Sequence, residues 1–381
     1  GRFLEMTLSD LKNKQTLRMV GLMTGTSMDG LDICVADVTF ANDSVQFRTV
    51  GFTTVLFTEK LREDIRQALA GPTHLVTRVH YDLGRFYAEQ TDHFLTDAAI
   101  GDIDAVAMHG QTIHHISGEA TLQIGEPSFL AEVLTVPVVS DFRARDISIG
   151  GTGAPLIPIV DKWLLQRETE AVICLNLGGI ANVTYLPAKN SNEDLSGFDT
   201  GPGMALLDEA ANHLLGDVLD EGGNKALSGT PDEEAVAHWM EDSFVIAKPP
   251  KSTGRDYFGP AWLEKYIPDL TDWDSSDLLA SLSLFTARSV AVNCRKFLPV
   301  QNVEEIIVSG GGAYNRAVMK SLEKKFSLVS IVTSDTFGID PHMKEALGFA
   351  VLGAAYLKGI PGNSPSVTGA SRPVVLGKLT V

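Results

Sequence analysis

Residues 20–38 read VGLMTGTSMDGLDICVADV: an apolar run, a small polar interruption and a second apolar run. Both flanks are rich in β-forming or small residues, so the stretch predicts two strands joined by a tight turn. The interruption, MTGTSMDG, holds two glycines, three hydroxyl side chains and one aspartate. Glycine lets backbone N–H groups approach an oxyanion, and hydroxyl groups add donors. The stretch is therefore either a plain hairpin turn or a turn that binds phosphate.

The two common phosphate-binding motifs do not fit this stretch. No lysine follows its second glycine, and a strand follows where a P-loop requires a helix. The spacing and the following element also exclude GxGxxG, which argues against an NAD-dependent dehydrogenase.

The composition is that of an ordinary globular protein. The 381 residues are 44% hydrophobic and 21% charged, and at roughly 100–200 residues per domain this length predicts two domains. The net charge of −17 disfavours nucleic acid and anionic membranes as partners. Residues 171–188 are uncharged, but they contain Asn, Gly and Pro and predict a buried strand and turn instead of a membrane span. Three separated cysteines in apolar runs predict buried, reduced thiols, as in a cytosolic protein.

Strands alternate with helices along the chain. Apolar periodicity predicts helices at 59–70, 73–100, 204–216, 232–243, 275–298 and 343–358. Apolar runs predict strands at 18–38, 45–57, 103–110, 171–187, 304–309, 328–335 and 372–381. Residues 136–158 predict a strand followed by a loop. The pattern indicates an α/β protein with a mixed sheet in each of two domains.

Two later segments also place glycines directly after an apolar run, as the opening stretch does. LNLGGIANVT (175–184) again predicts strand, turn and strand, and SGGGAYNRAVM (309–319) predicts strand, turn and helix. The second arrangement aims a helix N-terminus at a ligand, with no Cβ in the way. Taken singly, LNLGGIANVT favours a plain turn, whereas SGGGAYNRAVM is equally compatible with a plain turn and with a ligand site.

An aspartate stands in a further glycine-rich turn, SGFDTGPGMALLD (196–208). Asp199 precedes Gly201, Pro202 and Gly203, so its carboxylate is either a base aimed into a site or a helix cap. AMHGQTIHH (107–115) offers histidines, Gln111 and Thr112; hydrogen bonding to a substrate fits these residues better than zinc, because no Cys, Asp or Glu accompanies them.

Taken in order, these segments and their neighbours resemble one family. MTGTSMDGLD, HGQTIHH, SDFRARD, GGTGAPL, LNLGGIANVT, GFDTGPG, KSTGR, SGGGAYN, KEALGFA and PGNSPSVTGA, spread from about residue 20 to 377, are similar to the anhydro-N-acetylmuramic acid kinases. The resemblance implies the two-domain fold of the sugar kinase, heat-shock ATPase and actin superfamily. It assigns residues 18–136 and 362–381 to the N-terminal domain and 137–361 to the C-terminal domain. MTGTSMDG then corresponds to the phosphate-1 loop, LNLGGIANVT to the phosphate-2 loop and SGGGAYN to the adenosine motif.

The resemblance also implies a reaction. The 1,6-anhydro ring of anhydro-N-acetylmuramic acid is hydrolysed, and its 6-oxygen takes the γ-phosphoryl group of ATP. The product is N-acetylmuramic acid 6-phosphate, in the recycling of peptidoglycan in the bacterial cytoplasm. Asp199 matches the catalytic base, and Asp29 is expected near Mg²⁺ through water. Arg143 is expected to bind the lactyl carboxylate and Glu345 a sugar hydroxyl.

The further site residues follow from the same resemblance. Nucleotide binding is expected at Gly25, Thr26, Ser27, Met28, Asp29, Gly30, Leu31, Asp32, Gly178, Gly179, Asn182, Gly310, Gly311, Gly312 and Asn315. Substrate binding is expected at His109, Gln111, Thr112, Arg143, Asp146, Gly201 and Glu345. We also expect a homodimer. The alternative is a nucleotide-switched binding protein of the same fold without kinase activity.

Overall fold

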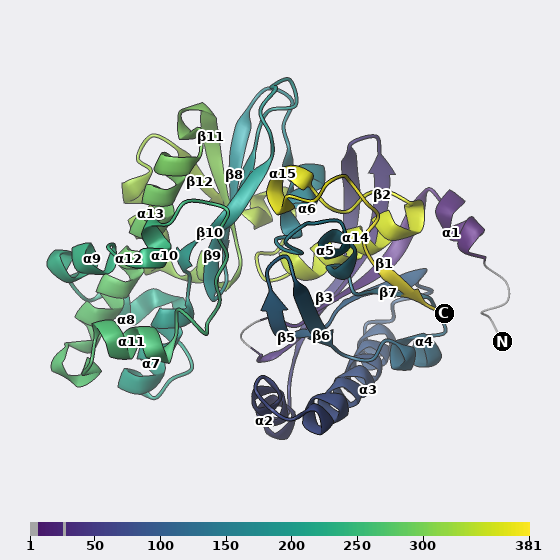
Figure 1. Ribbon diagram of the computed structural model, residues 1–381, viewed down its shortest axis with the longest axis horizontal. Coiled ribbons are helices and arrows are strands. Elements are labelled where there is room, and N and C mark those ends of the chain that lie inside the picture. The colour runs from purple at the N-terminus through teal and green to yellow at the C-terminus, as the bar shows by residue number, and fades with distance from the viewer. Residues whose placement is uncertain (1–6, 26–27) are drawn as a thin grey trace. The chain divides into compact units, whose positions relative to one another are not determined.

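The computed structural model describes residues 7–25 and 28–381, which form two compact α/β units. The first unit contains the residues up to Leu164 together with Met343–Val381, and the second contains Leu165–His342. Each unit has a mixed β-sheet flanked by helices, which confirms the predicted fold class (Figure 1).

The sheet of the first unit has the strand order β13-β7-β4-β1-β2-β3. Strand β1 pairs antiparallel with β2 and parallel with β4, and β7 joins β4 to the last strand of the chain. The strands of this unit, including the separate hairpin β5–β6, are β1 Thr16–Met23, β2 Gly30–Ala41, β3 Ser44–Leu56, β4 Ala105–His109, β5 Gln111–Ile116, β6 Ala120–Ile124, β7 Val138–Ser140 and β13 Lys378–Thr380.

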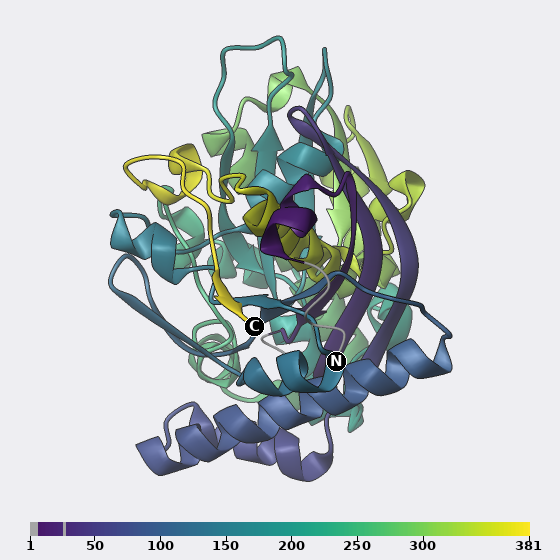
Figure 2. The same cartoon turned by 90° about the vertical axis from the view of Figure 1, so that its right-hand side faces the viewer.

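Helices cover both faces of this sheet. Successive side chains of a strand point to opposite faces, and buried apolar residues of β1 point to each face. Val20 and Leu22 of β1 face a core shared with α2, α3 and α4, while the alternate residues of β1 face α14. Figure 2 shows the long helix α3, in blue, running beneath the purple strands. The helices are α1 Leu8–Asn13, α2 Glu59–Ala68, α3 Thr73–Asp97, α4 Ser128–Leu134, α5 Ala144–Ser148, α6 Ile157–Leu165, α14 Lys344–Lys358 and α15 Pro365–Thr368.

Helix α14 lies unusually close to the sheet. A Cβ at Gly21 of β1 would stand 1.9 Å from the carbonyl oxygen of Ala346, and one at Gly353 would stand 2.5 Å from the Ala107 Cβ. Glycine on each side of the contact therefore sets the distance between the helix and the strands. The position of Glu345, in the first turn of α14, follows from this contact.

The second unit has the sheet order β10-β9-β8-β11-β12. Strand β8 pairs antiparallel with β9 and parallel with β11, so the unit repeats the order and directions of β3-β2-β1-β4-β7 in the first unit. The bounds are β8 Ala171–Leu177, β9 Ile180–Leu186, β10 Ser196–Pro202, β11 Val303–Ser309 and β12 Ser330–Thr333.

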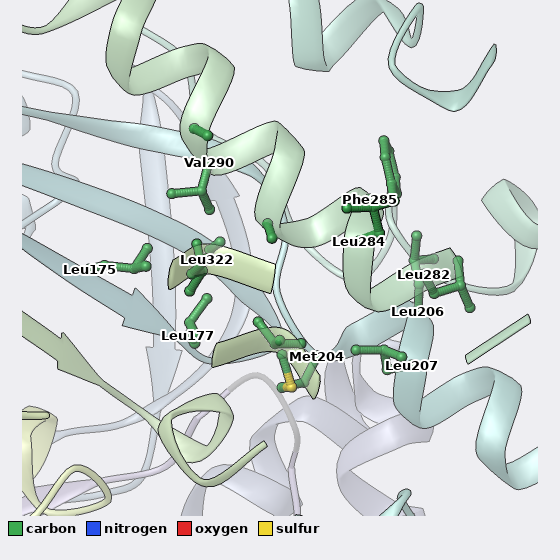
Figure 3. Close-up of a cluster of buried hydrophobic side chains, with 14 of the residues drawn as sticks. Leu175, Leu177, Met204, Leu206, Leu207, Leu282, Leu284, Phe285, Val290 and Leu322 are labelled. Carbon is green, nitrogen blue, oxygen red and sulfur yellow. The ribbon is translucent and has the colours of Figure 1, made fainter. Parts of the chain in front are cut away.

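The long helix α12 forms the centre of the core of the second unit. Figure 3 shows Phe285 and Val290 of α12 in a buried cluster with Leu175 and Leu177 of β8 and Leu322 of α13. The α-helices are α7 Ala205–Leu215, α8 Asn224–Leu227, α9 Glu233–Trp239, α10 Ser243–Ile246, α11 Pro260–Tyr266, α12 Ser275–Phe297 and α13 Arg316–Lys325. The short 3₁₀ helices are η2 Glu221–Gly223, η3 Leu270–Asp272, η4 Val300–Asn302, η5 Gly311–Tyr314 and η6 Ser334–Phe337.

Three of the differences from the sequence-based expectations concern the unit boundaries, residues 141–158 and the terminal strand. The compact units divide at Leu164 and Met343, whereas the expected boundaries were at 136/137 and 361/362, because β7 pairs with β4 and α14 packs on β1. Residues 141–158, expected as a loop, contain α5 and the start of α6. The expected terminal strand is limited to β13. The three cysteines are free and buried, as predicted.

We predict that Gly21→Ala destabilises the first unit. The added methyl would meet backbone atoms of Ala346 and Ala350, which cannot move independently of α14. Overpacking of this kind lowers the free energy of unfolding by about 1–3 kcal/mol or more. A urea titration measures the loss, with Gly101→Ala as the control because a Cβ there would have no neighbour within 4 Å. Equal unfolding midpoints for the two variants would contradict the assignment.

Candidate active-site residues

The first glycine-rich turn joins β1 to β2, as predicted. Thr24 is buried with its hydroxyl 3.1 Å from the Tyr87 hydroxyl. The Met28 N–H donates to the Gly25 carbonyl, and Met28 adopts a φ of 56°. The Asp29 carbonyl accepts from Phe57 N–H at 2.9 Å, which joins the turn to the end of β3.

The remaining residues expected around this turn differ in their surroundings. Thr26 and Ser27 lie outside the described residues. The Leu31 side chain is fully buried in the core, so only its backbone is available to a nucleotide. Asp32 accepts a hydrogen bond of 2.5 Å from the Thr54 hydroxyl. Gly30 begins β2, where a Cβ would stand 2.5 Å from the Val55 carbonyl oxygen.

A charged group in the first unit brings together Glu345, Asp32 and Arg143. Burial is the main cause that raises the pKa of the Glu345 carboxyl, and the charge of Asp32 adds to it. Lys344 and Arg143 oppose this shift in the Glu345 pKa. The structure thus groups the two residues expected to bind the sugar carboxylate and a sugar hydroxyl.

Histidine 109 holds the Arg143 guanidinium as a neutral acceptor. The Nε and Nη2 atoms of Arg143 lie 3.2 and 3.1 Å from His109 Nε2, and Nη1 donates to the Gly153 carbonyl. Burial, with the nearby Arg143 charge, lowers the pKa of His109 well below its ordinary value. Burial also lowers the pKa of Arg143 to about 10, against the charge of Glu345.

Gln111 and Thr112 follow His109 at the start of β5. The Gln111 side chain is 2% exposed, and its Oε1 has no hydrogen-bond partner among the described residues. Buried acceptors are normally satisfied, so this oxygen is available to a ligand donor. The Thr112 hydroxyl accepts from Gln123 at 3.3 Å.

Asp146 supports the local backbone instead of pointing to an open site. Its fully buried carboxylate accepts from Gly153 N–H, the Asn363 amide and the Thr368 hydroxyl. A Cβ at Gly151 would stand 2.1 Å from its Oδ2. These bonds join α5 to the segment 363–368, and they favour a positioning role over the expected direct contact with substrate.

Four polar side chains form a row across the sheet of the second unit. Ser309 pairs with Asn176, Asn176 with Asn182, and Asn182 with Asp199, on the successive strands β11, β8, β9 and β10. Paired residues on neighbouring strands present their side chains to the same face. We call these four residues the polar row. Asp199 therefore lies on the same face of the sheet as Asn176 and Ser309. These two residues stand at the ends of β8 and β11, where the two glycine-rich turns begin.

The turn after β8 packs tightly against the turn after β10. The Gly178 carbonyl accepts from Met204 N–H, and the Gly179 carbonyl accepts from the N–H groups of Gly203 and Ala205. A Cβ at Gly203 would stand 2.3 Å from the Gly178 oxygen. Only glycine permits this approach, which fixes the turn relative to the segment that carries Asp199.

The GGG turn begins at the end of β11 and leads into α13 as predicted. Gly310 adopts a φ of 84°, and a Cβ there would stand 2.7 Å from the Leu177 backbone. A Cβ at Gly312 would meet the Leu177 side chain at 2.5 Å, whereas one at Gly311 would find its nearest neighbour at 3.5 Å. Asn315 caps α13 by accepting from Val318 N–H, so its side-chain oxygen is already used by the helix.

Asp199 is a hydrogen-bonded but desolvated carboxyl. Its Oδ2 accepts from Thr253 N–H at 2.8 Å, and its own N–H donates to the Lys251 carbonyl at 3.1 Å. Burial raises the pKa of Asp199 to about 7, although the Thr253 bond and the Lys251 charge act to lower it. Gly201 follows a β-bulge, where a Cβ would approach Ser289 at 3.3 Å.

Lys251 and Asn293 support Asp199, and neither was among the expected site residues. The Lys251 ammonium donates to the Phe244 and Val245 carbonyls and to Asn293 Oδ1 at 2.7–3.0 Å. Burial lowers the pKa of Lys251 to about 8; the charge of Lys296 adds to this, whereas Asp199 and Asp242 oppose it. Three acceptors match the three donors of an ammonium group. The KSTGR motif marks this segment, but its spacing from Asp199 gave no sign of contact.

Residues 17–381 match the sequence model of the family described as anhydro-N-acetylmuramic acid kinase. The chain belongs to the anhydro-N-acetylmuramic acid kinase family. This confirms the family suggested by the motifs.

Curated relatives named anhydro-N-acetylmuramic acid kinase are similar over nearly their whole length. The chain is 38% identical to that of Salinibacter ruber, covering 97% of this chain and 98% of the relative. It is 39% identical to that of Picosynechococcus sp., covering 95% and 99%. Among solved structures, component A of the Acidaminococcus fermentans (R)-2-hydroxyglutaryl-CoA dehydratase is 16% identical with a TM-score of 0.42, covering 90% of this chain and 99% of that one.

In residues 7–25 and 28–381, no cluster of three or more His, Cys, Asp or Glu side chains is arranged to hold a metal ion. Within the same ranges, no helix is both long enough and apolar enough to cross a membrane.

We predict a pH-dependent stability difference between Asp199→Asn and the wild type. The folded-state pKa of about 7 exceeds the ordinary value of 3.8, so the folded protein binds this proton more tightly than the unfolded chain. Wild-type stability is therefore lost as the pH rises from about 4 to about 7, whereas the Asn variant is spared that loss. In thermal melts, the melting temperature of the variant minus that of the wild type should increase as the pH rises from about 4 to about 7.

The same substitution at the exposed Asp194 controls for the loss of a carboxylate. A difference between Asp199→Asn and wild type that does not change with pH would contradict the desolvated state of Asp199.

Proposed function

We propose that this protein is an ATP-dependent kinase of 1,6-anhydro-N-acetylmuramic acid. It hydrolyses the anhydro ring and phosphorylates the 6-oxygen, which gives N-acetylmuramic acid 6-phosphate in peptidoglycan recycling. The observation that carries the proposal is the polar row: it sets Asp199, with its pKa of about 7, on one sheet face with two glycine-rich turns. The choice of substrate rests on the match of residues 17–381 to the family.

Asp199 is the general base of the proposed reaction. It takes a proton from water, and the water oxygen attacks the anomeric carbon. The bond from that carbon to the 6-oxygen breaks, and its electron pair passes to the 6-oxygen, which then attacks the γ-phosphorus as ADP leaves. A carboxyl with a pKa near 7 is about half ionised at neutral pH, and its ionised form is basic enough to accept a proton.

The first unit supplies the groups that bind the sugar. Arg143 is positively charged at neutral pH because its pKa is about 10, and its neutral partner His109 leaves that charge uncompensated, so the guanidinium can bind the lactyl carboxylate. Glu345 accepts from a sugar hydroxyl. The unpartnered Oε1 of Gln111 accepts from a hydroxyl or amide of the substrate.

The glycine-rich turns bind the nucleotide. Backbone groups at Gly25 and Gly178 bind phosphate, and the open space at Gly311 lies beside the adenosine. Asp29 fits Mg²⁺ bound through water, because this ion is held in proteins by one or two carboxylates together with phosphate oxygens and water. The ion neutralises charge on the phosphates.

The cellular setting belongs to the same proposal. The family reaction consumes a cell-wall fragment, so we place the protein in the bacterial cytoplasm. We also propose that it works as a homodimer. A nucleotide-switched binding protein of the same fold would need neither a base such as Asp199 nor a sugar-binding arginine.

Purified protein should release ADP from MgATP only when anhydro-N-acetylmuramic acid is present. In oxygen-18 water, attack at the anomeric carbon puts the heavy oxygen on the anomeric hydroxyl and none in the phosphate, which mass analysis of the product measures. Equal ADP release with and without the sugar would exclude the kinase, and label in the phosphate would exclude the coupled mechanism.

Asp199→Asn should lower turnover by roughly 10²–10⁴-fold, the usual contribution of a positioned general base. The Asn side chain can still accept from Thr253 N–H but cannot take a proton from water. ATP affinity should remain at the wild-type value, as an equilibrium binding titration measures. Near-normal turnover would show that Asp199 has a structural role alone.

A further inference from the structure

The guanidinium of Arg255 lies against the tip of the β8–β9 turn. A Cβ at Gly179 would stand 2.6 Å from Arg255 Nε, 3.0 Å from Nη2 and 3.1 Å from Cζ. The absence of a side chain at Gly179 therefore lets the plane of the guanidinium rest on the turn. Arg255 ends the KSTGR motif, two residues after Thr253, which binds Asp199.

One nitrogen of this guanidinium is hydrogen-bonded within the protein and another is not. Its Nη2 donates to Asp208 Oδ2 of α7 at 3.3 Å. Its Nε is buried and has no hydrogen-bond partner among the described residues. A buried donor left unpaired costs free energy, so an unpaired Nε beside a glycine turn indicates a site for an acceptor that the protein itself does not supply.

The surroundings favour an anion as that acceptor. The carbonyl oxygens of Gly178 and Gly179 already accept from backbone N–H groups at 203–205. Gly178 is open, since a Cβ there would find its nearest neighbour at 3.6 Å. A planar guanidinium beside an open glycine fits a phosphate group, whose oxygens can accept from two donors of the fork.

We propose that Arg255 binds the phosphate chain of the nucleotide at the β8–β9 turn, with Asp208 holding the guanidinium in place. This inference rests on the kinase function proposed above and adds a cationic phosphate ligand from a segment 76 residues beyond the turn. Because the same segment carries Lys251 and Thr253, it joins the phosphate turn to the base Asp199.

The test is equilibrium binding of ATP, ADP and AMP to the wild type, Arg255→Gln and Arg255→Lys. Charge-assisted hydrogen bonds are strong enough that Arg255→Gln should weaken ATP binding by about 10–100-fold. ADP binding should weaken less and AMP binding should not change. Lysine should restore part of the ATP affinity, because it keeps the charge but lacks the fork.

Arg167→Gln is the matched control. Arg167 lies in the same unit with 27% of its side chain exposed, against 29% for Arg255, but it pairs with Glu170 and Glu305. Its loss should leave the affinity for all three nucleotides unchanged. An equal loss of AMP and ATP binding in Arg255→Gln would overturn the proposal, as would unchanged ATP affinity together with weakened sugar binding.

A second variant displaces the guanidinium without removing its charge. The Cβ of Gly179→Ala would collide with Arg255 Nε, the far part of a flexible side chain. Gly179→Ala should therefore weaken ATP binding in the wild type, and add little to Arg255→Gln in the double variant. Fully additive losses would show that the arginine and the turn act independently.

The outcomes separate this inference from the kinase proposal. Sugar-dependent ADP release by the wild type, together with an Arg255→Gln variant that binds ATP normally, would reject the arginine and keep the kinase. Weaker ATP binding by Arg255→Gln, together with a wild type that releases no ADP when the sugar is present, would keep the phosphate contact and reject the kinase.

Discussion

The proposed chemistry of the second unit depends on the state of Asp199, whose carboxyl is buried away from water but keeps a hydrogen bond from Thr253 N–H. Burial alone would favour the neutral acid, whereas the Thr253 N–H and the Lys251 ammonium favour the carboxylate. The two groups that lower the pKa of Asp199, Lys251 and Thr253, belong to one segment. Hydrogen bonds from Lys251 to residues of α10 and α12 hold this segment in place. Lys251 donates to the carbonyls of residues 244 and 245 and to the side-chain oxygen of Asn293. Asn293 also donates to the carbonyl of Thr200, which directly follows Asp199. Asp199, the proposed base, is thus supported by neighbours on both sides of it.

The core continues this support. Asp242 is fully buried and caps α10, and it also accepts from Trp262 Nε1 and the hydroxyls of Tyr257 and Tyr266. These bonds position the α10 carbonyls that bind Lys251. Aromatic packing, including Trp262 stacked on Phe285 of α12, fills the surrounding volume. The buried carboxylate of Asp242 therefore helps to hold Lys251, which in turn supports the second buried carboxyl, Asp199.

Sequence periodicity predicted most of the fold because its main signals are local. The two strand-turn-strand units, the strand-GGG-helix unit and α12 are confirmed near their expected bounds. The unit boundaries depend on pairing between β7, β4 and β13, which are distant in sequence, and the pattern could not show this pairing. Residues 141–158 appeared loop-like because Gly and Pro obscure the short helices there.

The candidate site shows the same limit. Resemblance marked Asp199, and only the structure shows the burial that sets its pKa. The sequence also could not show that Asp146 is fully bonded, or that Arg255 reaches Gly179, because these contacts join segments far apart in the chain. Residue type and spacing identify candidate groups, whereas burial and partner geometry determine which of them remain available to a ligand.

The two units use opposite strategies with charge. In the second, a carboxyl is desolvated so that its pKa rises toward neutrality. In the first, Arg143 is paired with a neutral imidazole instead of a carboxylate, since burial and the arginine itself keep His109 unprotonated. A direct carboxylate partner would have neutralised the guanidinium, whereas His109 only orients it, and Glu345 acts on it through its charge. The arginine is thereby held in position with its charge available, which is the property that the proposed recognition of an acidic sugar requires.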